Sequence, residues 1–152
     1  MKVMKASKTL GAIITVVQIL SFVALVAGMH TIIGILNTTL PTGQQVIQPE
    51  MGDPVVIPFT FHPRNEGFLE ATLTISLSLM AGVDQILATD SAIVTIPPGS
   101  TTPVDLELSI PLNQYQNTMS ELDLMSWMVD VKVTTLFNLI SFRNTMTITG
   151  GA

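Results

Sequence analysis

Cysteine is absent from the 152 residues, which excludes disulfides, thiolate catalysis and cysteine-ligated zinc. Aromatic residues make up only 5% of the chain and charged residues only 11%, which is low for a soluble protein. The missing charge is concentrated in one place, because the 28 residues from Thr9 to Leu36 contain no Asp, Glu, Lys or Arg. Setting aside about 40 residues for this stretch and its flanks leaves roughly 110, the size of one domain.

The uncharged stretch predicts a transmembrane helix over residues 9–36. At about 1.5 Å per residue such a helix is roughly 42 Å long, whereas the hydrocarbon core of a bilayer is about 30 Å thick. The helix can therefore cross with tilt, or with a turn or two protruding. Because Lys2, Lys5 and Lys8 precede the span and no basic residue follows it closely, we expect residues 1–8 to be cytoplasmic and the remainder to lie outside the cell.

The chain beyond the span carries all eleven acidic residues against three basic ones, a net charge of −8. Nucleic acids and anionic lipid surfaces attract concentrated Lys and Arg, so this charge argues against both as partners of the domain. We expect the lipid bilayer itself and other membrane or surface proteins, including further copies of this chain, to be the partners.

Two other interpretations of the N-terminus stay open. A cleaved secretory signal has a hydrophobic region of about 7–15 residues, which is much shorter than this one, and no small-x-small cleavage site ends the stretch. Lys5-Ala6 before Ser7, followed by a long apolar helix, resembles the class III signals of archaeal pilins and archaellins. The acidic residue often found early in the mature pilin helix is missing.

Four positions in the stretch are candidates for packing against a neighbouring helix: Gln18, Gly28, His30 and Gly34. Glutamine can form a hydrogen bond between helices, and glycine lets two backbones approach closely. A lone span that tolerates one amide, with His30 at the membrane interface, explains the same residues.

Residues 37–52 predict a stem, because prolines and glycines replace the apolar run there. The helix should end near Leu36 to Leu40. Asn37-Thr38-Thr39 is also an N-glycosylation sequon on the outer side of the span, so Asn37 is a candidate glycosylation site close to the membrane.

The hydrophobic period changes from helical to two at Val55, and the alternation is unbroken from Leu69 to Met80. One apolar and one polar face are typical of antiparallel sheets. About seven short strands follow from the pattern, at 55–61, 69–80, 85–88, 92–96, 104–110, 129–134 and 139–148. They predict a mainly β chain whose residues 53–149 form an immunoglobulin-like antiparallel β-sandwich.

One short helix is expected over residues 117–128. Thr118 and Glu121 have capping-box spacing, and Met125 and Met128 continue an apolar series with a spacing of three. Trp127 on this helix is expected to plug the core or lie at its rim.

Several of these segments together resemble the late-embryogenesis-abundant type 2 family, also called the water-stress and hypersensitive-response domain. The segments are 55–61, Asn65-Glu66-Gly67, the strand from Leu69, 96–100 (IPPGS) and 106–112. The resemblance implies a non-enzymatic immunoglobulin-like sandwich on an N-terminal anchor, linked in some members to protection against desiccation. Asn65-Glu66-Gly67 departs from the Asn-Pro that is usual in the family.

Residues for catalysis, cofactors or metals are not apparent in the sequence. His62 is the only histidine outside the span, Asp105 and Glu107 are expected on the wet face of a strand, and Glu121 and Asp123 face different directions on the expected helix. We therefore expect no enzyme, no cofactor and no metal.

The preferred function is a structural or accessory subunit of a cell-surface or membrane complex. A pilin-like filament subunit, a stress-protective domain, and a sandwich that binds an apolar or glycan ligand through its 98–99 and 113–117 loops are the alternatives.

Overall fold

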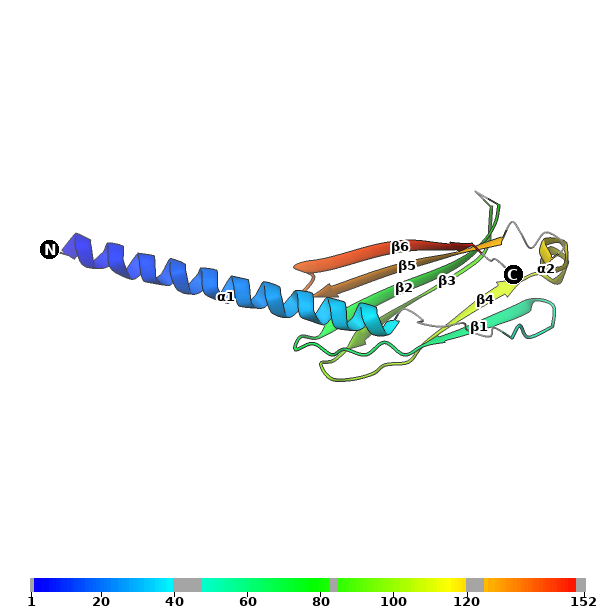
Figure 1. The fold of residues 1–152 in the computed structure, drawn as a ribbon, viewed down its shortest axis with the longest axis horizontal. Coiled ribbons are helices and arrows are strands. Elements are labelled where there is room, and N and C mark those ends of the chain that lie inside the picture. The colour runs from blue at the N-terminus through cyan, green and yellow to red at the C-terminus, as the bar shows by residue number, and fades with distance from the viewer. Residues whose placement is uncertain (1, 40–47, 83–84, 120–124, 150–152) are drawn as a thin grey trace.

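The computed structural model describes residues 2–39, 48–82, 85–119 and 125–149. Within these ranges the chain forms a long N-terminal helix, six strands in two antiparallel sheets and one short helix (Figure 1). The chain is thus mainly β, and the sandwich architecture expected from the alternating pattern is confirmed.

Helix α1 (Lys2–Thr39) is 38 residues long, or about 57 Å at 1.5 Å per residue. It ends within the expected limits. Its N-terminal part projects away from the sheets, and its last turns lie along one end of them (Figure 1). The segment Leu10–Thr39 is long and apolar enough to cross a membrane. Ile32 and Ile35 at its end are buried, so these residues of the expected span contact protein.

The two sheets face each other across the core. The smaller sheet pairs β1 (Val55–Phe61) with β4 (Val104–Ile110). The larger has the order β3-β2-β5-β6, formed by β2 (Ala71–Ala81), β3 (Gln85–Ile96), β5 (Met125–Thr135) and β6 (Ile140–Thr149).

The core consists of the apolar residues that alternate along these strands. In β1 and β4 every second residue is buried, beginning with Val55 and Val104. Burying a Val, Leu or Ile side chain contributes about 1.5–3 kcal/mol, so the alternation supplies the main driving force for stacking the sheets. The largest fully buried side chains include Leu73, Ile75, Leu79, Leu106, Leu108, Ile110, Val131 and Val133.

The two short strands expected at 85–88 and 92–96 are wrong as separate elements, because the structure has one continuous strand, β3. The polar residue between the two expected strands, Asp90, has hydrogen-bond partners, one of them on the opposite sheet. Its carboxylate accepts hydrogen bonds from the backbone N–H of Ser91 at 2.8 Å and of Glu107 in β4 at 2.9 Å. Asp90 therefore closes one edge between the two sheets instead of ending a strand.

The short helix expected at 117–128 is misplaced. Helix α2 is Leu112–Met119, and the first-turn N–H of Leu112 donates to the Asp53 carboxylate at 3.3 Å. Trp127 lies in β5 opposite Leu79, partly buried, with its ring edge-on to Phe59 at 5.3 Å. Expected positions 120–124, which include Glu121 and Asp123, lie outside the described residues.

Asn65 organises the loops at the end of the sandwich where α1 docks. Its side chain is 0% exposed. Its Nδ2 donates to the carbonyls of Leu69 at 2.8 Å and Ile96 at 2.9 Å, and its Oδ1 accepts from Gly67 N–H at 2.9 Å. Because every polar group of the amide is used, this side chain joins the β1–β2 connection to the end of β3.

Replacing Asn65 with Ala should lower the free energy of unfolding by about 3 kcal/mol, because it removes the three hydrogen bonds that the buried amide makes with the Leu69 and Ile96 carbonyls and the Gly67 N–H. Urea unfolding of the detergent-solubilised chain, followed by Trp127 fluorescence, measures the change. Asn144→Ala on the exposed β6 surface is the matched control and should shift stability by less than about 0.5 kcal/mol. Equal effects would contradict the role given to Asn65.

Candidate functional site

Two regions of the described structure lie outside the core and offer surface for another molecule or a membrane. One is a pocket at the end of the sandwich far from α1. The other is the junction where α1 meets the opposite end of the domain (Figure 1).

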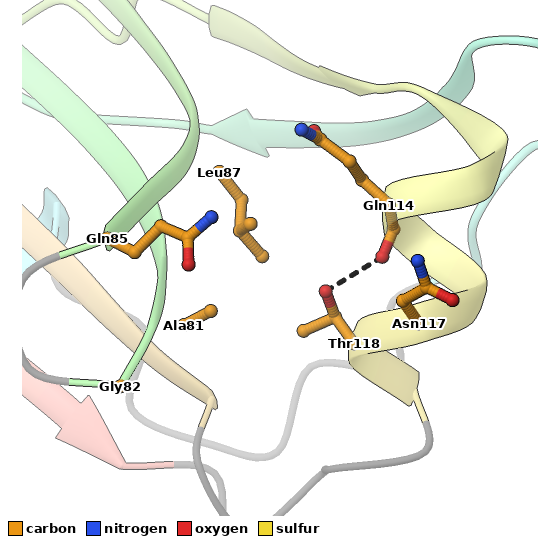
Figure 2. Close-up of a pocket in the computed structure, with 7 residues that line it drawn as sticks. All are labelled: Ala81, Gly82, Gln85, Leu87, Gln114, Asn117 and Thr118. Atoms are coloured by element: carbon orange, nitrogen blue, oxygen red, sulfur yellow. Dashed lines mark hydrogen bonds between the residues drawn. The ribbon is translucent and has the colours of Figure 1, made fainter.

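The distal pocket has a volume of about 350 Å³. Figure 2 shows α2 on one side of it and the β2–β3 end on the other, with the Thr118 hydroxyl donating to the Gln114 carbonyl at 2.7 Å. Its lining residues are Ala81, Gly82, Gln85, Leu87, Gln114, Asn117 and Thr118. None of these side chains titrates near neutral pH, so the described part of the lining offers amide hydrogen bonds but no acid, base or charged nucleophile.

The 98–99 and 113–117 segments, both expected to be ligand-binding loops, lie at opposite ends of the sandwich, and the second is helical. Residues 113–117 belong to α2 at the distal end, whereas Gly99 lies at the α1 end, where its N–H donates to the Asn65 carbonyl at 2.8 Å. The seven residues of β4, about 23 Å in length, separate the two segments.

The junction is built from one face of the last turns of α1. Ile35 is 0% exposed and joins the core of the sandwich. Thr38 Oγ1 accepts the N–H of Arg64 at 2.9 Å and lies 3.0 Å from the Arg64 carbonyl. Thr31 Oγ1 accepts the N–H of Leu69 at 3.4 Å. The helix is therefore attached to the domain by apolar packing and by side chain–backbone hydrogen bonds.

Glycines bring the two surfaces together. A Cβ added at Gly67 would overlap the Cα and side chain of Thr31, so the loop backbone lies directly on the helix backbone there. A Cβ at Gly34 would lie 3.3 Å from Glu66 Cβ, and one at Gly28 would overlap Ile140 at the start of β6. The contact at Gly67 is the strictest of the three, because a side chain there would collide with helix backbone, whereas the Ile140 side chain near Gly28 is free to move.

The residues singled out in the sequence of α1 have different positions. Gly28 and Gly34 are buried and face the domain of their own chain. Gln18 is exposed on the projecting part, where packing against another helix stays a prediction. His30 is exposed and stacks on Phe68 with the ring centroids 5.5 Å apart. Asn37 is exposed in the last turn, and its glycosylation also stays a prediction.

Thr31, Thr38 and Gly67 form the junction and were missed in the sequence. The helix side of the junction can be found from a periodic pattern in the sequence. Small and apolar residues lie at spacings of three and four along one helix face, namely Gly28, Thr31, Ile35 and Thr38. A stripe of glycine and threonine on an otherwise apolar helix is a recognisable packing surface.

The strongest ionic contact described lies away from both regions, between β5 and β6. Arg143 Nη2 donates to Asp130 at 2.7 Å and Arg143 Nε to the same carboxylate at 3.0 Å. Hydrogen bonding from Arg143 is the main cause that holds the pKa of Asp130 below its usual value, while partial burial opposes it. A depressed carboxyl pKa adds stability above the unfolded pKa, and this stability is lost as the pH falls through the folded pKa.

Metal ligation has no support in the described residues, since among them no three or more His, Cys, Asp or Glu side chains come together. His62 is exposed at the end of β1. Asp105 is also exposed, and its carboxylate accepts from the Thr60 hydroxyl across the β1–β4 pair at 2.8 Å.

Gly67→Ala should loosen the junction, because the added methyl meets helix backbone that cannot rotate away. We expect a cost of about 2 kcal/mol, which corresponds to roughly 30-fold faster hydrogen exchange at the Leu69 and Arg64 amides. Gly11→Ala is the control, because a Cβ there meets nothing within 4 Å. Unchanged exchange in Gly67→Ala would contradict direct docking.

No protein-family model and no curated protein matches the sequence. Among solved structures, a Bacteroides uniformis β-glucuronidase is similar at 10% identity and a TM-score of 0.44, over 68% of this chain and 12% of that one. A protein from Archaeoglobus fulgidus is similar at 15% identity and a TM-score of 0.38, over 72% and 99%. A solution structure from Arabidopsis thaliana is similar at 12% identity and a TM-score of 0.40, over 69% and 78%.

This chain thus spans 12% of the length of the β-glucuronidase. The resemblance to the late-embryogenesis-abundant type 2 family stays a prediction from sequence motifs.

Proposed function

We propose that this chain is a single-pass membrane protein that holds a non-catalytic β-sandwich outside the cell, as a structural or accessory subunit of a surface or membrane complex. The observation that carries the proposal is the division of α1 into a bare apolar part and a docked part.

The bare part supports membrane insertion. From Leu10 to Val23 every residue of α1 is exposed, and the large apolar ones point to all sides of the helix. A helix that is apolar all round is stable when buried in lipid or protein. No segment of the described domain covers this part (Figure 1).

The docked part supports a display role. Because Ile35 is in the sandwich core and Thr38 bonds to Arg64, the domain is held against the end of the helix. The lysines at positions 2, 5 and 8 favour a cytoplasmic N-terminus, so this arrangement would present α2 and the distal pocket farthest from the membrane. The amide side chains that line the distal pocket could form hydrogen bonds with a partner protein at that end of the domain.

The natural absence of cysteine allows a clean test of topology. Two single-cysteine variants, Ser7→Cys before the span and Ser109→Cys on the exposed side of β4, are treated with a membrane-impermeant maleimide. In intact cells Ser109→Cys should be labelled and Ser7→Cys should react only after permeabilisation. The reverse pattern, or recovery of the unlabelled chain in the soluble fraction, would refute the proposal.

A filament subunit is the second candidate, favoured by a bare helix that projects from one end of a sandwich and could bundle with copies of itself. This role predicts removal of the first six residues, consistent with Lys5-Ala6 before Ser7. Mass spectrometry of the native chain separates the two functions. A mass that includes the first six residues would favour membrane display, and a chain that begins at Ser7 would favour the filament.

A further inference from the structure

The end of the domain from which α1 emerges carries three large apolar side chains exposed to solvent. Phe137 is 98% exposed, Leu139 is 83% exposed and Phe68 is 75% exposed. Phe137 and Leu139 belong to the β5–β6 turn, and Phe68 belongs to the β1–β2 connection. We call these three residues the apolar collar.

Contacts with α1 set the height of the collar along the helix. Gly28 faces Thr135 and Ile140, which flank the β5–β6 turn on either side. His30 stacks on Phe68. The two collar segments also lie beside each other, because the Thr135 hydroxyl donates to the Glu70 carbonyl at 2.7 Å. The collar therefore lies beside α1 near residues 28–30. The β5–β6 turn points along the helix toward its N-terminus there (Figure 1).

The length of α1 between the lysines and the collar matches the thickness of the hydrocarbon core of a bilayer. Nineteen residues, 9–27, separate Lys8 from Gly28, and none of them is charged. They span about 28 Å of helix, close to the roughly 30 Å of the hydrocarbon core. With the lysines at one interface, the opposite interface falls at the collar.

The backbone of the β5–β6 turn is adapted to project these side chains. Leu136, Phe137 and Asn138 all have positive φ, at 51°, 53° and 67°, and the Leu139 N–H closes the turn on the Leu136 carbonyl at 3.0 Å. Left-handed backbone is unfavourable for a bulky residue such as Phe, and such strain is concentrated where function requires it. A turn selected for stability alone would place Asn or Gly at position 137.

We propose that Phe68, Phe137 and Leu139 insert into the outer interface of the bilayer that α1 crosses, so that the sandwich rests on the membrane at a fixed height. The inference depends on the membrane-spanning role proposed above. Burial of apolar surface drives this contact. Glu66 and Glu70 flank Phe68 and give no attraction to anionic lipid, so zwitterionic lipid is sufficient.

Fluorescence quenching in vesicles tests the collar. The full chain is reconstituted in phosphatidylcholine that contains spin-labelled lipid, with a fluorophore on one introduced cysteine at a time. Ser141→Cys lies beside the turn and leaves all three collar residues in place, and Thr147→Cys is the control on the same exposed strand, about 20 Å farther from the turn. Leu20→Cys reports the span itself.

Lipid quenching at position 141 should exceed that at 147 by about threefold. The double variant Phe137→Asn/Leu139→Ser should reduce quenching at 141 to the level at 147. Asparagine adopts left-handed backbone more readily than phenylalanine, so this variant keeps the turn while removing the apolar contact.

The outcomes separate the two proposals. Quenching at Leu20→Cys without quenching at Ser141→Cys overturns the collar and leaves the span intact. Absence of quenching at Leu20→Cys overturns the membrane-spanning function. A fluorophore at 141 that is shielded only at high protein-to-lipid ratio, and not quenched by lipid, indicates a second copy of the chain on the collar and also overturns the inference.

Discussion

The close contact between the Gly67 loop and the Thr31 turn of α1 is the constraint on which the arrangement of the molecule depends. It permits the helix to approach until Ile35 enters the core and the hydroxyl of Thr38 reaches the backbone of Arg64. A side chain at position 67 would hold the two surfaces apart and weaken each of these contacts. Helix and sandwich therefore form one unit instead of an anchor and a tethered domain.

Much of the sandwich could be predicted because its signals are local. The unbroken alternation from Leu69 to Met80 corresponds to β2, and the alternation at 104–110 corresponds to β4. Prediction failed where distant contacts decide the structure. The Thr118–Glu121 spacing favours a helix there, yet Trp127 follows in a strand because it pairs with Leu79, 48 residues earlier. Asp90 likewise looks like a break until Glu107 supplies its partner.

The junction was harder to predict for a different physical reason. Hydropathy falls from residues 10–27 to residues 28–39, where His30, Asn37 and three threonines interrupt the apolar run. The end of a membrane span gives the same fall, so hydropathy does not reveal that one face of the helix contacts protein. Threonine adds little information, because Thr31 also bonds to the Ala27 carbonyl in its own helix at 2.9 Å, an interaction that needs no domain. Asn65 has ordinary turn chemistry in the sequence, and its partners at Ile96 and Ser100 appear only in the folded chain.

Because the end of α1 packs on the sandwich, a change in the tilt of the helix moves the whole domain. Under the proposed membrane-spanning role, α1 would adjust to a thinner or thicker bilayer by tilting, and the attached sheets would turn with it. Strand β2 has 11 residues and is about 36 Å long, so a tilt of roughly 10° would displace its far end by about 6 Å. The thickness of the surrounding lipid would thereby determine where α2 stands relative to its neighbours.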